Sequence, residues 1–495
     1  MTLFDALAAS AQKRPGKTAL FWGDTKFSFS EILERSAHVC HELQHSFDVK
    51  PGDRVGLWLK NRPEFAFSLF GILQSGSVAV PINNFLKSQE VAYILNDAGI
   101  DLLITDDELS QHVPALLSTR PRLKVLNVDT ASLTSPSLHH SLNDRRLATG
   151  EQLAILIYTS GTTGRPKGAM LTHANLIHNV ESCRDVLHVN ENDIMAVMLP
   201  MFHSYMLTVG LLLPLIVGGS IVLVKSLHPL RNALQEILER RSTILPAIPQ
   251  FYRSIIHASL PTPLPFRICI SGAAPLPKQV LKEFEEKFHV PIIEGYGLSE
   301  ASPVVTKNPL DGRRKAGSIG LPLPRVEVSI QDESGAQLPP HEIGEVCVRG
   351  GNVMQGYWRQ PEETAKTVRN GWLLTGDIGY RDADGYYYIT DRKKDMLLVN
   401  GINVYPREIE EVLYQFPGVK EAAVIGMPDP RKGEQPVAYV APTDGTALEE
   451  KAVQHFIRER LADYKTPRRV IVLPSLPRNA TGKILKTALR EMPLT

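Results

Sequence analysis

The chain is 495 residues long, and at about 150 residues per domain this length predicts roughly three domain-sized units. Hydrophobic residues make up 43% of it and charged residues 22%, a balance typical of chains that bury large cores. The 54 Lys and Arg residues nearly cancel the 53 Asp and Glu residues, so the formal net charge is +1. Because a dedicated nucleic-acid-binding protein shows a marked basic excess, the charge argues against nucleic acid as a partner, while local anion sites stay open.

The cysteines and the N-terminus predict a reduced, cytoplasmic protein. Cys40, Cys183, Cys269 and Cys347 lie far apart in the sequence, which indicates neither a zinc knuckle nor a disulfide framework. The first residues lack a basic start followed by a long apolar core, so we predict no signal peptide.

In chain order, residues 1–190 alternate helical and strand patterns. These patterns occupy, in turn, 29–43, 54–59, 63–76, 78–81, 91–95 and 102–105. Strands that alternate with helices predict an α/β fold, with parallel sheets flanked by helices.

The segment Met206–Val224 contains 19 residues without a charge, close to the ~20 that a membrane span needs. Pro214 and the pair Gly218–Gly219 interrupt it, and the β-branched residues that follow favour a strand. We therefore predict a buried helix, a glycine turn and a core strand, with a membrane span as the alternative.

From about Gly344 onward, short strand patterns separated by Gly and Asp predict an antiparallel sheet or a small barrel. The charged run Thr390–Asp395 then separates this part from further helix and strand patterns. We predict an N-terminal domain at 1–391, β-rich over about 320–391, a hinge at 392–395 and a C-terminal domain at 396–495.

The segment Tyr158–Gly168 (YTSGTTGRPKG) is the most informative for chemistry, because a strand pattern leads into four hydroxyl residues, three glycines and a lysine. Glycines let backbone N–H groups approach phosphate oxygens, while the hydroxyls and Lys167 add donors and charge. The spacing differs from the common P-loop. Composition alone leaves a polar glycine loop without a ligand as the alternative.

This segment resembles the phosphate-loop signature of the adenylate-forming superfamily, which contains acyl-CoA synthetases, luciferases and the adenylation domains of peptide synthetases. Further motifs resemble those of the family and follow in its order: Ser271–Pro275, Gly295–Glu300 (GYGLSE), Leu374–Asp377, Asp391–Asp395 with Asn400–Gly401, and Pro477–Lys483. The resemblance spans nearly the whole chain. It implies two stacked mixed sheets with a small β-barrel, followed by a smaller, mobile α+β domain.

The resemblance also implies a site for ATP, Mg²⁺ and coenzyme A. The residues it places around ATP and CoA are Thr159, Ser160, Gly161, Thr162, Thr163, Gly164, Gly272, Ala273, Ala274, Tyr296, Gly297, Ser299, Asp377, Arg392 and Gly401. The residues it gives a catalytic role are Lys483, Glu300, Lys167 and His203, and Glu300 is also the metal ligand, since a hard cation prefers carboxylate oxygen.

Each of these residues could also be interpreted as an ordinary structural residue without a role in the reaction. Tyr296 alone would be an aromatic residue in a glycine turn, and Asp377 an ordinary turn aspartate. Glu300 and Lys483 alone would be solvated surface residues. The family position instead sets Tyr296 against adenine and Asp377 on the ribose hydroxyls.

The implied reaction joins a carboxylate to AMP and then to the thiol of CoA, with the C-terminal domain rotating about Lys394 between the two steps. The motif Met201–Tyr205 carries His203 and no acid, which argues against amino-acid substrates. The apolar run that begins at Leu207 favours a medium- to long-chain fatty acid, with aryl acids next.

Other interpretations stay open at this point. The enzyme class also includes ligases that pass the adenylate to a carrier protein or stop at acyl-AMP. A membrane protein built around Met206–Val224 is the non-enzymatic alternative. Base rates favour a homodimer, and peripheral association with the inner membrane face is left open.

Overall fold

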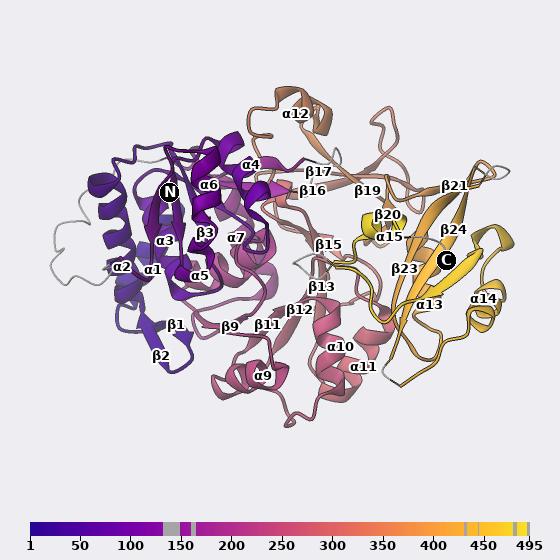
Figure 1. The fold of residues 1–495 in the computed structure, drawn as a ribbon. Coiled ribbons are helices and arrows are strands. Elements are labelled where there is room, and N and C mark those ends of the chain that lie inside the picture. Colours follow the sequence, from indigo (N-terminus) through magenta and orange to yellow (C-terminus); the bar gives the residue numbers. More distant parts are fainter. Residues whose placement is uncertain (132–148, 160–164, 430–432, 444, 479–482, 493–495) are drawn as a thin grey trace.

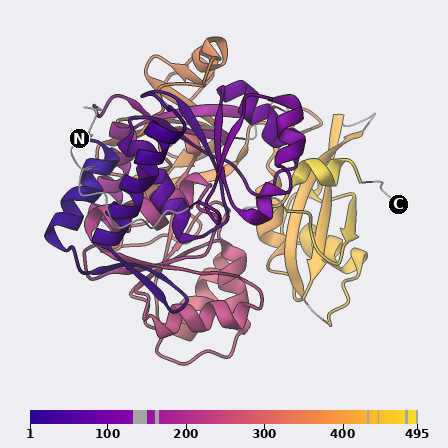
Figure 2. The same cartoon turned by 60° about the vertical axis from the view of Figure 1, so that its left-hand side comes forward.

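The computed structural model describes residues 1–131, 149–159, 165–429, 433–443, 445–478 and 483–492 (Figure 1). Its strands form four sheets. The first two make up most of the N-terminal part, the third follows them in the chain, and the fourth belongs to a C-terminal unit that lies at one side (Figure 2).

The first sheet has six strands in the order β6-β5-β3-β4-β7-β8, parallel except for the antiparallel β7–β8 pair. Its strands are β3 (Arg54–Trp58), β4 (Val78–Pro81), β5 (Leu102–Thr105), β6 (Lys124–Asn127), β7 (Leu153–Thr159) and β8 (Lys167–Thr172). The accompanying helices are α3 (Pro63–Gln74), α4 (Ser88–Ala98), α5 (Asp107–Ser110) and α6 (Val113–Thr119). Alternate residues of β3 enter different cores, Leu57 on one face and Trp58 on the other, as the two-residue period of a strand requires.

The second sheet has nine strands in the order β15-β14-β13-β12-β11-β9-β10-β1-β2, with a parallel centre and antiparallel edges. Its strands are β1 (Thr18–Trp22), β2 (Thr25–Ser28), β9 (Ile194–Val197), β10 (Ser220–Leu223), β11 (Ile244–Ala247), β12 (Ile268–Ser271), β13 (Ile292–Gly297), β14 (Val304–Lys307) and β15 (Leu321–Pro322).

The helices of this part complete the layers around the two sheets. They are α1 (Leu3–Lys13), α2 (Phe29–His41) with the π-helical turn Glu42–Ser46, α7 (His173–Leu187), the π-helical segment η3 (Met206–Leu212), α8 (Leu213–Val217), α9 (Leu230–Glu239), α10 (Pro249–His257), α11 (Lys278–Phe288) and the 3₁₀ turn η4 (Ser299–Ala301). Both sheets share one apolar core with residues of α1, α2, α3 and α7. The predicted α/β fold with stacked sheets is confirmed.

The uncharged segment Met206–Val224 is buried inside this part, as expected. It contains η3 and α8, then Gly218 in the left-handed region at φ +91°, and then β10. Gly218 ends α8 there because glycine adopts positive φ without a Cβ penalty. Among the described residues, no helix is long and apolar enough to cross a membrane.

The third sheet is antiparallel, with the order β16-β17-β19-β18 and β20 on β19. Its strands are β16 (Val326–Gln331), β17 (Gly344–Gly350), β18 (Val368–Arg369), β19 (Trp372–Arg381) and β20 (Tyr387–Arg392), with α12 (Pro361–Thr367) before β18. The antiparallel sheet expected here is therefore present, and its described strands pair in an open order.

The C-terminal unit, which we define as 397–492, has its own sheet and two apolar clusters. Its elements are β21 (Leu397–Val399), β22 (Ile402–Val404), α13 (Pro406–Leu413), β23 (Val419–Asp429), β24 (Gly433–Pro442), α14 (Glu450–Arg458), η5 (Asp463–Lys465), β25 (Arg469–Val472) and α15 (Lys486–Arg490). The hinge predicted at 392–395 comprises the last residue of β20 and the turn that follows it.

Candidate active site

A carboxylate at the centre of the candidate site joins residues from two sheets. Asp377 on β19 is 4% exposed. It accepts a hydrogen bond of 2.5 Å from the hydroxyl of Tyr296 on β13, and its other oxygen lies 3.0 Å from Nε of Arg392 on β20. Burial and the charge of Asp377 raise the pKa of Tyr296 well above its ordinary value, so the phenol stays a donor. An ionised carboxylate has about four acceptor sites, so both oxygens of Asp377 can still accept from a ligand's hydroxyl groups.

Glu300 forms a second acidic position beside the predicted phosphate loop. Its Oε1 accepts a 2.9 Å hydrogen bond from the hydroxyl of Tyr357 and a longer one, 3.4 Å, from the hydroxyl of Thr159. Thr159 is the last residue of β7, whereas the predicted site residues Ser160, Gly161, Thr162, Thr163 and Gly164 lie outside the described residues. Glu300 therefore lies where the chain enters the glycine loop.

The fit of Glu300 to Mg²⁺ depends on its free acceptor capacity. Within the described ranges, no group of three or more His, Cys, Asp or Glu side chains could hold a metal ion. Mg²⁺ is usually bound by one or two carboxylates together with substrate phosphates rather than by a complete protein cage. The hydroxyl groups of Tyr357 and Thr159 both bond to Oε1, so Oε2 is suited to a cation that arrives with ATP.

Lys167 is buried at the start of β8 and is paired in this structure. Its Nζ lies 2.5 Å from Oε2 of Glu363 on α12 and 5.4 Å from the ring centroid of Tyr357. Hydrogen bonds from Lys167 and then Lys366 lower the pKa of Glu363 to about 2. Lys167 would have to exchange Glu363 for phosphate in order to contact ATP.

Lys483 of the C-terminal unit reaches the same cluster from the far end of the chain. Burial first, and then the charge of Arg392, lower its pKa to about 8, while Asp377 acts in the opposite direction. Burial and then Lys483 lower the pKa of His203 to about 4. Lys483 is therefore close enough to Asp377, Arg392 and His203 to interact with each of them electrostatically.

The loop of Lys483 is anchored at both of its ends. Arg478 and Ile484 form an isolated antiparallel bridge, and the N–H of Leu485 donates to the carbonyl of Pro477 at 2.8 Å. This pairing fixes the residues that follow Lys483 and lead into α15.

His203 and Ser299 border the cluster from two neighbouring loops. The Nδ1 of His203 accepts from the N–H of Tyr205 at 3.3 Å, and the hydroxyl groups of Ser204 and Ser299 lie 2.9 Å apart. This hydroxyl contact ties the histidine motif to the GYGLSE segment. Because its pKa is about 4, His203 is neutral at pH 7.

Steric contacts explain why small residues occupy the predicted adenine side of the site. A Cβ on Gly272 would lie 3.2 Å from the ring of Tyr205, and one on Gly297 would lie 2.2 Å from the carbonyl oxygen of Pro303. Ala273 is exposed at φ +65°, and Ala274 is half-buried. Gly297 is therefore required by packing, Gly272 is favoured because a larger residue would press on Tyr205, and Ala273 leaves its backbone open to a ligand.

Gly401 is not brought to this cluster. It lies in the turn between β21 and β22 at φ +77°, exposed, with no described atom within 4 Å of the place a Cβ would take. Sequence reasoning also missed Tyr357 and Glu363, which contact Glu300 and Lys167. No local pattern marks them, because their partners lie far away in the sequence.

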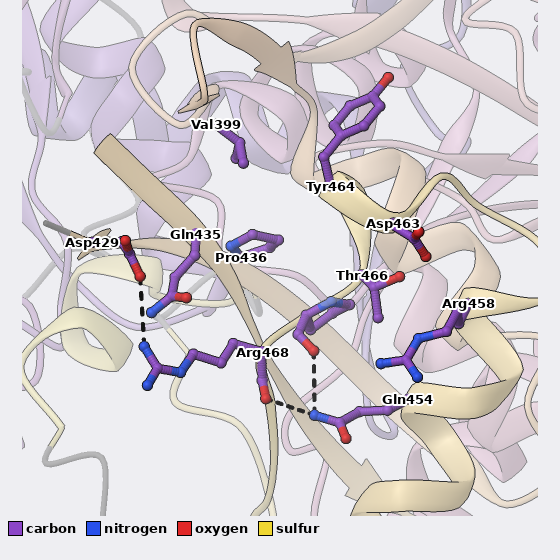
Figure 3. Close-up of a pocket in the computed structure, with 11 residues that line it drawn as sticks. Val399, Asp429, Gln435, Pro436, Gln454, Arg458, Asp463, Tyr464, Thr466 and Arg468 are labelled. Carbon is purple, nitrogen blue, oxygen red and sulfur yellow. Dashed lines mark hydrogen bonds and ion pairs between the residues drawn. The ribbon is translucent and has the colours of Figure 1, made fainter. Parts of the chain in front are cut away.

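A separate hollow of about 900 Å³ lies in the C-terminal unit (Figure 3). Arg468, Arg458 and Tyr464 are part of its lining. Arg468 lies 3.6 Å from Asp429, and the side chain of Gln454 donates to the carbonyl of Arg468 at 2.7 Å. Guanidinium groups suit a ligand that carries phosphate.

Known proteins resemble this chain along nearly its full length. A long-chain-fatty-acid–CoA ligase of Bacillus subtilis is 35% identical, with 99% of this chain and 94% of that protein covered. A feruloyl-CoA synthase of Amycolatopsis is 36% identical, with 97% of each covered. Among solved structures, ATP-bound MatB of Rhodopseudomonas palustris superposes with a TM-score of 0.92 at 33% identity, covering 99% of each chain. An anthranilate CoA ligase in complex with anthranoyl-AMP has a TM-score of 0.91 at 30% identity, covering 99% of this chain and 96% of that one.

Sequence models of two domains also match. Residues 7–358 match the AMP-binding enzyme family, and residues 408–483 match the C-terminal domain of AMP-binding enzymes. These matches confirm the resemblance to adenylate-forming enzymes that the motifs carry. The chain therefore belongs to the AMP-binding enzyme family.

Proposed function

We propose that this protein is an AMP-forming ligase that joins a medium- to long-chain fatty acid to coenzyme A. In the first step a carboxylate oxygen bonds to the α-phosphorus of ATP, and the bond to the leaving pyrophosphate breaks. In the second step the CoA sulfur, after losing its proton, bonds to the acyl carbon, and AMP leaves. The observation that carries the proposal is that Lys483 is half-buried and close enough to Asp377 and Arg392 for their charges to act on it.

Lys483 acts on the first step in this proposal. Two anions must approach each other when a carboxylate attacks a phosphate, and a fixed positive charge lowers that barrier most in a site that excludes water. The ammonium group of Lys483 would contact both the carboxylate and the α-phosphate. Lys167 would leave Glu363 and hold the outgoing pyrophosphate.

The body of the protein holds the nucleotide. Tyr296 would stack on adenine next to the Gly272–Ala274 backbone, while Asp377, held by Arg392, accepts from the ribose. The hydroxyl of Ser299 would donate to a phosphate oxygen. Glu300 would hold Mg²⁺, which neutralises phosphate charge when bound.

The acyl chain would run beside η3. Leu207, Val209, Leu211 and Leu212 are fully buried there, and the preceding motif offers His203 in place of an acid. An apolar wall of this kind supports an alkyl chain. The fatty-acid ligase relative supports the same class.

An aryl acid is the second candidate substrate. The feruloyl-CoA synthase and the anthranilate ligase among the relatives favour it. The same apolar wall would accept an aromatic ring, since it contains no feature specific for a flexible chain.

The CoA thiol is the proposed acceptor, and Gly401 would line its path once the C-terminal unit turns about Lys394. The hollow with Arg458, Arg468 and Tyr464 would then take the nucleotide end of CoA. Transfer to a carrier protein is the alternative acceptor. A homodimer and peripheral membrane association stay predictions.

The test is a pyrophosphate-release assay on a panel of alkanoic and aryl acids, with and without CoA, with mass-spectrometric detection of acyl-CoA. Acyl-CoA formation that is fastest with C8 to C16 alkanoic acids is the expected result. Pyrophosphate release without any acyl-CoA would contradict CoA as acceptor. A faster rate with cinnamic or benzoic acids would replace the fatty acid by an aryl acid.

A further inference from the structure

Lys307, at the end of β14, is the one buried lysine of the described chain whose amine lacks a hydrogen-bond partner there. It is 2% exposed, and its Nζ makes no hydrogen bond within the described ranges. Burial lowers its pKa to about 8, which leaves it mostly charged at pH 7. A buried amine without an acceptor is costly, so the site calls for a ligand that supplies one.

The strand register places the side chain of Lys307 on the face of the sheet opposite to that of Tyr296, because successive side chains of a strand alternate. Lys307 pairs with Gly295, directly before Tyr296. A Cβ on Gly295 would lie 2.8 Å from Cγ and 3.6 Å from Cε of Lys307. The side chain of Lys307 therefore runs across Gly295, in space that any larger residue at position 295 would fill.

The same face of the sheet is covered by α7 and η3. The side-chain amide of Asn179 on α7 donates to the carbonyl of Val304 at 2.7 Å, and the hydroxyl of Thr208 on η3 donates to the carbonyl of Ser302 at 3.1 Å. Val305, two residues before Lys307 and on the same face, belongs to the core shared with η3. Lys307 thus enters the layer that holds the proposed acyl wall.

Cys183, the titratable group whose charge acts on Lys307, does not satisfy the amine. Burial raises the pKa of the Cys183 thiol to about 11, with Lys307 acting in the opposite direction, so Cys183 stays protonated at pH 7. A thiol is a weak acceptor.

We infer that Lys307 forms a polar end of the acyl site, and that the preferred acid carries an oxygen acceptor remote from its reacting carboxyl group. A hydroxyl, a carbonyl or a second carboxylate would serve, in an alkyl chain or on an aromatic ring. This inference rests on the proposed function and narrows its substrate class. An acid with a purely hydrocarbon far end would leave the Lys307 amine unsatisfied when bound.

Matched pairs of acids test the inference at pH 7 on the full chain. Each pair has the same carbon skeleton with and without the distal oxygen: hexanoic and adipic acid, octanoic and suberic acid, dodecanoic and 12-hydroxydodecanoic acid, cinnamic and 4-hydroxycinnamic acid. We expect the oxygenated member of at least one pair to have a kcat/KM about tenfold higher. In Lys307→Met the preference within that pair should vanish or reverse, while the KM for ATP stays unchanged.

Lys282→Met on exposed α11 is the control, and Lys307→Gln serves where Lys307→Met fails to fold. Equal or higher kcat/KM for the plain acid in every pair of the unmodified protein would overturn the inference and leave the proposed function standing. A Lys307 variant that folds, binds ATP normally and loses both members of a pair equally would also overturn it. Absence of pyrophosphate release with every acid would instead remove the proposed function and the inference together.

Discussion

The N-terminal body and the C-terminal unit contribute to the candidate site in different ways. The body supplies a network whose members hold one another: Tyr296 and Arg392 bind Asp377 directly, and Tyr357 binds Glu300. The C-terminal unit supplies Lys483, whose place depends on how the unit docks. We expect changes in the body to weaken nucleotide binding and changes in the C-terminal unit to slow the chemical step.

The largest expected effect on the rate comes from removing the amine of Lys483. Lys483→Ala should slow formation of acyl-AMP by about 10²- to 10³-fold, because a charge aimed at the reacting phosphate contributes mainly to the transition state. The affinity for ATP should change little, since Asp377 and Tyr296 remain. Pyrophosphate release and ATP titration calorimetry measure the two effects.

The control for this variant is the second step. Supplied acyl-adenylate and CoA should still give acyl-CoA at a rate close to that of the unmodified protein. Equal loss of both steps would mean that Lys483 supports the structure of the site as a whole.

The complementary change is in the body. Asp377→Ala removes the acceptor of the Tyr296 hydrogen bond and the partner of the Arg392 ion pair. Because the ribose would lose a charged acceptor as well, ATP affinity should fall by about 10- to 100-fold. Thermal unfolding should show that the fold persists. Asp24→Ala, at an exposed turn, is the matched control. An unchanged affinity for ATP would place the ribose elsewhere.

The pH dependence of the first step should report Lys483. Its ammonium group has a pKa of about 8, so it is charged below pH 8 and loses its proton as the pH rises through that value. The kcat/KM for ATP, which reports the free enzyme, should fall about tenfold per pH unit above pH 8. In Lys483→Arg the rate should be lower but flat from pH 7 to 10, because a guanidinium group stays charged. A flat profile in the unmodified protein would contradict the assignment.

The sequence predicted the centre of this site better than its surroundings. Tyr296, Asp377 and Lys483 could be named from motifs, because each is embedded in a distinctive run of residues. The partners Glu363 and Tyr357 could not, because they lie in segments without a motif and reach Lys167 and Glu300 only through the packing of α12 and its loop.

The fold was likewise predictable in part, where local sequence patterns determine it. Alternating patterns predicted the α/β layers and the buried segment Met206–Val224, because hydrophobic period and glycine positions are local. Alternating strand patterns also predicted the antiparallel third sheet, but the order in which its strands pair depends on contacts between distant residues and could not be predicted. The buried position of Lys307 was equally hidden, since a lysine in a short strand normally marks an exposed edge.

The smallest effect we predict concerns the docking of the two parts. Arg253 on α10 donates hydrogen bonds from its guanidinium group to the carbonyls of Val419, at 2.8 Å, and Lys420 in β23. These bonds hold the C-terminal unit where Lys483 reaches the nucleotide site, and each contributes about 1 kcal/mol. Arg253→Ala should therefore slow acyl-AMP formation by roughly 3- to 10-fold without changing ATP affinity or the rate from supplied acyl-adenylate.

Arg253→Lys should restore part of the loss, whereas Arg231→Ala, on exposed α9 away from the C-terminal unit (Figure 1), should have no effect. If Arg253→Ala slowed both steps alike, the contact would stabilise the body itself, and the position of Lys483 would not depend on it.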